Sequence, residues 1–208
     1  MSLFIAGAGG FGRETLDAVI AGWGAVDAFF DEVEPDRVVR GVPVRHPDTA
    51  PAGHDYVVGI ADPAVRRRLV SLLDSRGLNA RSVIHPRATI APDTGLGPGC
   101  VVLANAYVSS SVTVGAHVQV NYNATIGHDC TVEDFASIYP GANVGGGVTL
   151  AEGSTVGSGA VVRQRITIGA GSFVGAGAVV VSDVPEGVVA YGVPARVIRP
   201  TDSQTRAE

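Results

Sequence analysis

The sequence reads VNYNATIGHDCTV over residues 120–132, and this stretch contains two turns of the pattern that decides the fold. Val120, Ile126 and Val132 lie six residues apart, and an aliphatic residue occupies every sixth position from Ile84 to Val180. A period of six fits neither an α-helix nor an alternating strand, but it is typical of a parallel β-helix, in which each hexad makes one short strand and one tight corner. Three hexads close one triangular coil, so residues 18 positions apart are expected to stack, over about five coils.

A second column of small residues follows most of the aliphatic positions by four residues, and it completes the predicted core. Its members are Ala88, Cys100, Ala106, Ala124, Cys130, Ala136, Ala142, Ala160 and Ala178. The two cysteines lie five hexads apart, so they belong to different faces of the prism. They are therefore predicted to be buried, unpaired core thiols.

Composition excludes several classes of function. The formal net charge of −5 gives no positive surface for nucleic acid. No apolar run reaches the length of a membrane span, and the short apolar N-terminal stretch lacks the basic start of a signal peptide. A soluble, cytoplasmic protein is the expectation.

The first 80 residues follow a different pattern, in which short apolar strands alternate with helices. Strands are predicted at residues 2–6, 26–30 and 55–59, and helices at residues 13–21 and 64–75, the second after an Asp62-Pro63 helix start. This alternation predicts a small α/β, Rossmann-like parallel sheet. The chain thus divides into a Rossmann-like domain (1–80), a β-helix domain (81–183) and a C-terminal tail (184–208), whose last eight residues are expected to be disordered.

A glycine loop follows the first predicted strand. Gly7, Gly9 and Gly12 precede a helix, and Asp31 follows about 20 residues on, which matches the dinucleotide-binding fingerprint. Such glycines let backbone N–H groups and a helix N-terminus approach a phosphate. Because residues 1–80 supply only one mononucleotide-binding half, a nucleotide sugar or mononucleotide is favoured over NAD. The alternatives are that the loop is a purely structural turn and that Asp31 merely ends a strand.

His128 is the candidate catalytic residue, because its position two residues after Ile126 places it at an exposed corner. The residue stacked on it is Gly146, within a Gly145-Gly146-Gly147 corner that has no side chains. A histidine general base beside a glycine N–H that stabilises an oxyanion fits acyl transfer. Asp129 or Glu133 is expected to orient the imidazole. The alternative is that His128 is an ordinary polar corner residue.

The other histidines fit structural roles better. His117 falls on a different part of the prism and His85 at the junction with the first domain. The β-helix region has three histidines with no close pair, so no metal site is predicted.

Four segments carry a resemblance to a known family. They are Ala6-Gly7-Ala8-Gly9-Gly10-Phe11-Gly12-Arg13-Glu14, His85-Pro86-x-Ala88-x-Ile90, Asn121-x-x-Ala124-x-Ile126-x-His128-Asp129-Cys130, and Gly192-Val193-Pro194-Ala195-Arg196. In combination they resemble the left-handed β-helix (hexapeptide-repeat) acyltransferases, and among these the sialic acid O-acetyltransferase and nucleotide-amino-sugar N-acetyltransferase group. The resemblance covers nearly the whole chain and supplies the handedness, which periodicity does not.

The resemblance implies a homotrimer with acetyl-CoA between neighbouring prisms and no metal. It implies that His128 is the base, that Asp129 is the acid beside it, and that Asn121 and the Gly146 N–H lie near the thioester. The cofactor-contacting positions that it implies are Gly146, Gly147, Ser158, Gly175, Pro194 and Arg196. The positions implied to hold the nucleotide of the sugar donor are Gly7, Gly9, Gly12, Asp31, Gly59 and Ile60.

The function expected from this resemblance is acetyl-CoA-dependent N-acetylation of a nucleoside-diphosphate-linked 4-amino-4,6-dideoxy sugar. The sugar amine attacks the thioester directly, without an acyl-enzyme. O-acetylation of sialic acid or another sugar is one alternative, and a non-catalytic nucleotide-sugar sensor is another. Ser137 stands where some relatives carry a second histidine, which leaves a substrate role there in doubt. Arg163 and Arg165 are candidates for CoA phosphates, for the trimer interface, or for solubility alone.

Overall fold

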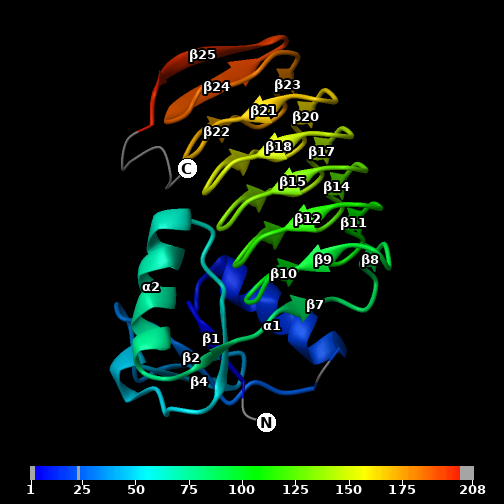
Figure 1. The fold of residues 1–208 in the computed structure, drawn as a ribbon. Coiled ribbons are helices and arrows are strands. Elements are labelled where there is room, and N and C mark those ends of the chain that lie inside the picture. Colours follow the sequence, from blue (N-terminus) through cyan, green and yellow to red (C-terminus); the bar gives the residue numbers. More distant parts are fainter. Residues whose placement is uncertain (1–2, 23, 202–208) are drawn as a thin grey trace.

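The computed structural model describes residues 3–22 and 24–201. Figure 1 shows an α/β unit at the N-terminal end, a stack of triangular coils beside it, and a hairpin at the far end of the stack. The expected fold class, a small Rossmann-like unit followed by a left-handed parallel β-helix, is confirmed. No helix in the described ranges is long and apolar enough to cross a membrane.

The N-terminal unit contains one six-stranded sheet in the order β3-β4-β2-β1-β5-β6. Its strands are β1 (Leu3–Ala6), β2 (Ala28–Phe30), β3 (Val38–Val39), β4 (Val42–Arg45), β5 (Asp55–Val58) and β6 (Asn79–Ala80), and its helices are α1 (Gly10–Gly22), α2 (Pro63–Ser75) and the short 3₁₀ turn η1 (Pro47–Thr49). All neighbours are parallel except β3 and β4. The Asp62 carboxylate caps α2 as predicted, accepting from the N–H groups of Ala64 and Val65.

Three details of this unit differ from the sequence prediction. Helix α1 begins at Gly10, inside the glycine loop, rather than at Arg13. Strands β3, β4 and β6 were not predicted, because they are short and mostly exposed and so lack a buried apolar run. Ile20, which the sequence places with Leu16 and Val19 on one side of the predicted 13–21 helix, is 52% exposed.

The coils follow the six-residue period without interruption. Every strand has two residues: β7 (Val83–Ile84), β8 (Thr89–Ile90), β9 (Gly95–Leu96), β10 (Val101–Val102), β11 (Tyr107–Val108), β12 (Thr113–Val114), β13 (Gln119–Val120), β14 (Thr125–Ile126), β15 (Thr131–Val132), β16 (Ser137–Ile138), β17 (Asn143–Val144), β18 (Thr149–Leu150), β19 (Thr155–Val156), β20 (Val161–Val162), β21 (Thr167–Ile168), β22 (Phe173–Val174) and β23 (Val179–Val180). Each strand pairs in parallel with the strand 18 residues away, as Ile126 does with Val144.

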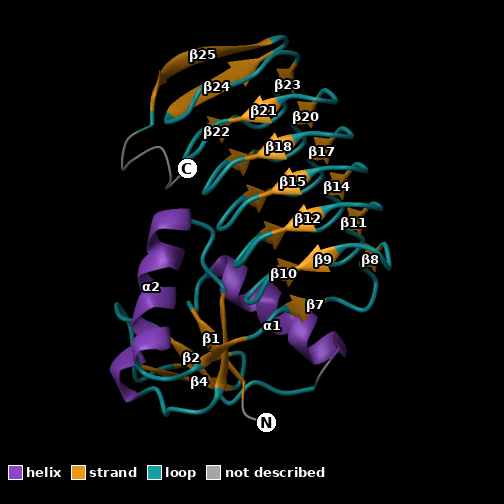
Figure 2. Ribbon diagram, in the orientation of Figure 1, coloured by secondary structure: helices purple, strands orange, loops and turns teal. Residues whose placement is uncertain are grey.

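The prism has three faces and three edges. The first face contains β7, β10, β13, β16, β19 and β22; the second contains β8, β11, β14, β17, β20 and β23; the third contains β9, β12, β15, β18 and β21. The first edge, between the first and second faces, includes residues 121–124 and 157–160. The second edge, between the second and third faces, includes 127–130 and 145–148, and the third edge includes 115–118 and 133–136. Figure 2 shows these edges as loops that stack along the prism.

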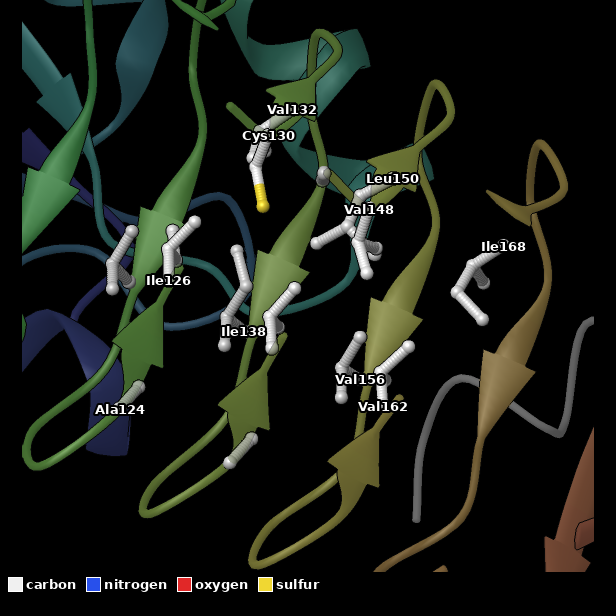
Figure 3. Packing of buried hydrophobic residues seen from close by; sticks show 14 of the residues in the cluster. Ala124, Ile126, Cys130, Val132, Ile138, Val148, Leu150, Val156, Val162 and Ile168 are labelled. Atoms are coloured by element: carbon white, nitrogen blue, oxygen red, sulfur yellow. The ribbon is translucent and has the colours of Figure 1, made fainter. Parts of the chain in front are cut away.

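The interior of the prism is filled by the two predicted columns. Figure 3 shows Ile126 of β14, Ile138 of β16 and Val156 of β19 among the packed core side chains, with Cys130 close by. Cys100 and Cys130 are buried free thiols. Small aliphatic side chains suit this interior because every coil must repeat the same narrow cross-section.

The C-terminal segment is more ordered than the predicted tail. Strands β24 (Val188–Gly192) and β25 (Ala195–Pro200) form an antiparallel hairpin, and β24 pairs with β22 to extend the first face. Ala190 and Ala195 are buried against the end of the core. The hairpin therefore covers apolar atoms that the last coil leaves open. Of the eight residues for which the sequence predicts disorder, Thr201 is described and donates its N–H to the Gly187 carbonyl, and residues 202–208 lie outside the described residues.

Candidate functional site

His128 and Asp129 form a pair on the second edge of the prism. His128 Nδ1 lies 2.7 Å from Asp129 Oδ2, and the two side chains are 67% and 66% exposed. Asp129 has φ +59°, a left-handed conformation that asparagine and aspartate tolerate better than most residues. A carboxylate on Nδ1 favours the tautomer with the proton on that nitrogen, which leaves Nε2 as the acceptor. The pair thus presents a free basic nitrogen to solvent.

Gly146 lies directly beside this imidazole, at the position that the 18-residue period predicts. A Cβ on Gly146 would stand only 2.7 Å from His128 Nε2, so the ring occupies the space of the missing side chain. The Gly147 N–H donates to the His128 carbonyl and is not available to a ligand. Within the described chain no hydrogen bond is found for the Gly146 N–H. Gly146, whose backbone N–H has no partner among the described residues, therefore packs against the imidazole.

Glu133 does not orient the imidazole, and that part of the sequence interpretation is wrong. Its side chain begins on the third edge, where Glu133 Oε2 accepts from the Glu152 N–H at 2.9 Å. The two charged residues on the same edge as His128, one coil beyond the glycine corner, are Arg163 and Arg165. The Arg165 N–H donates to the Gly146 carbonyl, and Arg165 Cγ lies next to Gly147. The glycine corner is thus bordered by the His128–Asp129 pair on one coil and by cations on the next.

The remaining residues expected to contact acetyl-CoA lie on the first edge instead. Asn121, Ser158 and Gly175 occupy three of its coils, and Pro194 lies in the hairpin turn that continues it. Gly175 also has an internal role, because a Cβ there would lie 2.7 Å from Tyr191 Cβ. The second face separates these residues from Gly146 and Gly147. A single chain therefore does not bring the two groups together.

Hollows flank the hairpin on this end of the molecule. One of about 590 Å³ is lined by Gly175, Tyr191 and Arg199 among others. A second, of about 370 Å³, includes Arg196 and Ala195 in its wall. Both hollows are lined in part by hairpin residues, so the hairpin offers apolar surface and the Arg196 and Arg199 side chains to a ligand that reaches it.

In the glycine loop, the glycines divide into two kinds. Gly7, Gly12 and Gly59 are packed against one another: a Cβ on Gly12 would be 1.9 Å from the Gly7 carbonyl oxygen, and one on Gly59 would be 2.7 Å from Gly12 Cα. Ile60 closes over Gly7, which has φ +105°. A Cβ on Gly9, by contrast, would meet no described atom within 4 Å. Gly9 thus faces open space at the start of α1, where backbone N–H groups are free to bind an anion.

Asp31 braces this loop from the end of β2. Its carboxylate accepts from the N–H groups of Ala8, Val33 and Glu34 and lies 3.4 Å from an Arg37 nitrogen. Burial acts to raise the pKa of Asp31, but the three backbone N–H groups and Arg37 together hold it below its ordinary value. Asp31 is therefore an ionised acceptor that is already engaged, and its first role is to fix the loop.

Sequence reasoning missed two buried polar residues behind the loop. Arg66 on α2 and Gln119 on β13 both donate to the carbonyl of Ile60. Arg66 belongs to an Arg66-Arg67-Arg68 run, which suggests a solvated face. Its spacing from Leu69 and Leu73 is the helical signal that predicts burial instead.

Neither cysteine is suited to nucleophilic chemistry. Burial raises the pKa of Cys100 to about 11 and also raises that of Cys130, so both are neutral thiols. Their sulfur atoms donate to the carbonyls of Gly115 and Gly145, inside the prism. Across residues 3–22 and 24–201, no group of three or more His, Cys, Asp or Glu residues is placed to hold a metal ion.

Comparisons with known proteins bear on both units of the chain. The family described as the PglD N-terminal domain matches residues 2–73. Among solved structures, a variant of perosamine N-acetyltransferase from Caulobacter crescentus, in complex with CoA and GDP-perosamine, is similar over 95% of this chain and 97% of that chain, with 32% identity and a TM-score of 0.90. No curated protein matches the chain.

Two further structures are similar over the same span. The acetyltransferase domain of PglB from Neisseria gonorrhoeae, in complex with acetyl coenzyme A, is 34% identical, with a TM-score of 0.89 over 95% of this chain and 98% of that chain. WeeI from Acinetobacter baumannii is 30% identical, with a TM-score of 0.90 over 95% of this chain and 100% of that chain. The likeness therefore includes the α/β unit, the prism and their arrangement.

Proposed function

This chain belongs to the family of left-handed β-helix acyltransferases that includes the nucleotide-amino-sugar N-acetyltransferases, and from that membership we propose its reaction. It transfers the acetyl group of acetyl-CoA to the amine of a 4-amino-4,6-dideoxy sugar carried by a nucleoside diphosphate. The observation that supports this most is the His128–Asp129 pair beside Gly146, in a chain that also has an open glycine loop. Because acetyl-CoA is made in the cytoplasm, the proposal places the reaction there.

His128 is the proposed general base. With Nδ1 held by Asp129, Nε2 accepts a proton from the sugar amine as its nitrogen attacks the thioester carbonyl. The Asp129 carboxylate then stabilises the imidazolium that forms, and the imidazolium returns the proton to the CoA sulfur as the C–S bond breaks and the amide is released. A positioned base of this kind contributes about 10²- to 10⁴-fold to a rate.

Gly146 is the proposed oxyanion donor. The residue packs against the imidazole and its N–H has no partner among the described residues, so we assign this N–H as the donor to the oxygen that becomes negative in the same event. A side chain at this position would collide with the ring and cover the donor. Direct attack by the amine is favoured over an acyl-enzyme, because the two cysteines are buried, neutral and inside the prism.

The nucleotide is proposed to bind at the glycine loop. Gly9 and the first turn of α1 offer unobstructed N–H groups to a diphosphate, and the helix dipole favours its charge. Gly7, Gly12, Asp31, Gly59 and Ile60 shape the loop through their mutual contacts. Binding energy gained at the nucleotide then holds the distant amine in place for reaction.

The division of candidate acetyl-CoA contacts between two edges supports a trimer. Gly146 and Gly147 lie on the second edge, whereas Ser158, Gly175 and Pro194 lie on or beside the first. In a cyclic assembly each interface joins one patch of a copy to a different patch of the next. A three-fold ring that brings the first edge of one copy to the second edge of its neighbour gives one complete site at each interface.

The proposal is tested by release of free thiol from acetyl-CoA in the presence of a panel of acceptors. The panel contains UDP-, dTDP- and GDP-linked 4-amino sugars, the same sugars without nucleotide, and sialic acid. Rapid release with one nucleotide-linked amino sugar, and slow release with its nucleotide-free form, is the expected result. Release with sialic acid alone moves the assignment to O-acetylation, and nucleotide-sugar binding without release on any acceptor favours a sensor.

A further inference from the structure

Arg66 is buried between the two units of the molecule. Its side chain, in the first half of α2, has no exposed surface. Arginine is almost never fully buried unless it is paired, because its charge must leave water. Within the described residues the four acceptors of this guanidinium are carbonyl and hydroxyl oxygens, and none is a carboxylate. An unpaired buried cation of this kind is retained at a cost, which calls for a role.

Two of the four acceptors lie in the N-terminal α/β unit, next to the glycine loop. Arg66 Nη1 donates to the carbonyls of Ile60 at 2.9 Å and Ala61 at 3.0 Å. These residues follow Gly59, which packs on Gly12 without room for a Cβ, and the Ile60 side chain closes over Gly7. The guanidinium therefore fixes the turn against which the glycine loop is built.

The other two acceptors belong to the prism. Arg66 Nη2 donates to the Phe135 carbonyl and to Ser137 Oγ, the latter at 3.0 Å. Both residues lie on the coil that begins at the His128 corner, seven and nine positions further along the chain. One planar group thus connects the turn of the nucleotide loop to the coil that carries the proposed base.

The surroundings of the guanidinium reinforce this connection. Gln119 Nε2 donates to the same Ile60 carbonyl at 2.9 Å and to the Val58 carbonyl at 3.2 Å, so the prism holds the turn from a second direction. Burial lowers the pKa of Arg66 to about 10, which leaves it charged at neutral pH. Arg66 Nε and Gln119 Oε1 are both buried without a partner among the described atoms.

We propose that Arg66 is a positioning residue, which sets the nucleotide loop relative to the His128 coil and so determines how well a nucleotide-linked acceptor binds. This inference rests on the proposed function and extends it to a residue that touches neither reacting group. Both ends of the substrate are bound by different units of the chain, so their relative placement decides whether the amine reaches the base.

Two neighbouring arginines provide matched controls. Arg67 is half exposed, pairs with Glu152 and lies with its guanidinium carbon 4.3 Å from the centre of the Phe135 ring. Arg68 is more than half exposed and pairs with Glu32. All three residues have the same chemistry and lie within one turn of α2. Only Arg66 reaches both the Ile60 turn and the His128 coil.

The test compares R66K, S137A, R67M and R68M with the parent chain. The dissociation constants for UDP, GDP and dTDP are measured by calorimetry, together with the KM values for the active nucleotide sugar and for acetyl-CoA. Lysine keeps the charge but cannot reproduce a fork that reaches four acceptors. We expect R66K to raise the nucleotide Kd and the sugar KM by about tenfold, with the KM for acetyl-CoA within about twofold. R67M and R68M are expected to leave the nucleotide Kd, the sugar KM and the acetyl-CoA KM within about twofold of the parent values.

A lower thermal midpoint of R66K with an unchanged nucleotide Kd and sugar KM overturns the proposal, because that is the signature of a purely structural residue. If R66K does not fold, the nucleotide Kd of S137A tests the proposal instead. This variant leaves the guanidinium in place and removes one of its acceptors on the prism, Ser137 Oγ. A rise of about threefold in its nucleotide Kd supports the proposal and an unchanged value overturns it. A parent chain that binds nucleoside diphosphates but acetylates none of the panel refutes the proposed function alone, and the Kd comparison still decides on Arg66. A parent chain that binds no nucleoside diphosphate overturns the Arg66 proposal.

Discussion

The stacking of residues 18 positions apart places His117 and His128 in the same way, but their side chains lie in opposite environments. Each ring lies against a glycine 18 residues away on the neighbouring coil. A Cβ on Gly99 would lie 2.2 Å from His117 Nδ1, and a Cβ on Gly146 would lie 2.7 Å from His128 Nε2. His117, however, is only 5% exposed, whereas the His128 side chain is 67% exposed.

The difference arises from what covers each edge. The third edge faces the α/β unit, and His117 is stacked between Tyr56 and Phe135 with its Nδ1 unsatisfied. The second edge is open, and His128 Nδ1 has Asp129 as its partner. A histidine on a glycine is thus a feature of coil stacking. The surroundings of the ring determine whether its unpaired nitrogen is buried, as in His117, or exposed to a substrate as a base, as in His128.

Gly99→Ala is expected to have the largest effect, and the effect is on stability. The new Cβ would collide with a ring that the stack holds on both sides, and Gly99 has φ +70°, which a side chain disfavours. We expect a loss of about 3 kcal/mol in the free energy of unfolding, measured by urea denaturation. If the loss is under about 0.5 kcal/mol, the ring is mobile and the contrast between the two edges is weaker than described.

Gly146→Ala is expected to have the opposite effect: it should lower turnover and leave stability almost unchanged. The exposed imidazole can swing away from a new Cβ, so the thermal midpoint should change little, while turnover falls about 100-fold because base and oxyanion donor are both displaced. Thiol release under saturating substrates measures this loss. Gly153→Ala is the comparison substitution on the third edge: Gly153, unlike Gly146, has a positive φ, and a Cβ there would meet only Pro63 Cβ at 3.8 Å. Equal losses of turnover in both variants would remove the special role of Gly146.

Asp129→Asn tests the pair itself and is expected to have a smaller effect. Asparagine tolerates the left-handed backbone and keeps the volume, but its amide does not stabilise an imidazolium. We expect kcat to fall about tenfold at unchanged thermal midpoint. Unchanged kcat across the pH range would mean that the carboxylate has no role in orienting His128.

The smallest expected effect is on the pH dependence of stability. Burial lowers the pKa of His117 below its ordinary value, with smaller contributions from Asp74, Arg66 and Asp134 of mixed sign. The folded state therefore prefers the neutral ring. Stability is fully present above about pH 6.5, the unfolded value, and is lost as pH falls toward the lowered folded pKa.

His117→Phe, which keeps an aromatic ring in the stack, is expected to flatten this slope between about pH 6.5 and 5. The free energy of unfolding is measured by urea denaturation at several pH values. A slope that persists in His117→Phe assigns the pH dependence to other groups.

The repeat made the prism predictable in detail. Because its strands are two residues long and recur every six, position alone placed His128 beside Gly146 and separated Cys100 from Cys130. The α/β unit has no such period. Strand β4 is held by pairing with β2, β3 by pairing with β4, and β6 by pairing with β5, rather than by apolar runs of their own, so the sequence carries little trace of them.

What remained unpredictable is the way the two units meet. Neither the charge run at Arg66 nor the outward position of Gln119 indicates burial until the α/β unit is placed against the first face. The engagement of Asp31 by three N–H groups likewise depends on a loop fold that its spacing from the glycines does not contain. Contacts between the two units join residues that are far apart in the sequence, and a periodic pattern within one unit does not predict them.

The most direct test of the account is turnover by His128→Ala, measured as thiol release with acetyl-CoA and the active nucleotide-linked amino sugar, beside His117→Phe as the buried counterpart. The account expects kcat of His128→Ala to fall by about 10³-fold, with acetyl-CoA affinity and thermal midpoint close to those of the parent. His117→Phe should keep kcat within about threefold, since its ring lies on another edge. Activity of His128→Ala within a few-fold of the parent would contradict the assignment of the open glycine edge as the catalytic centre.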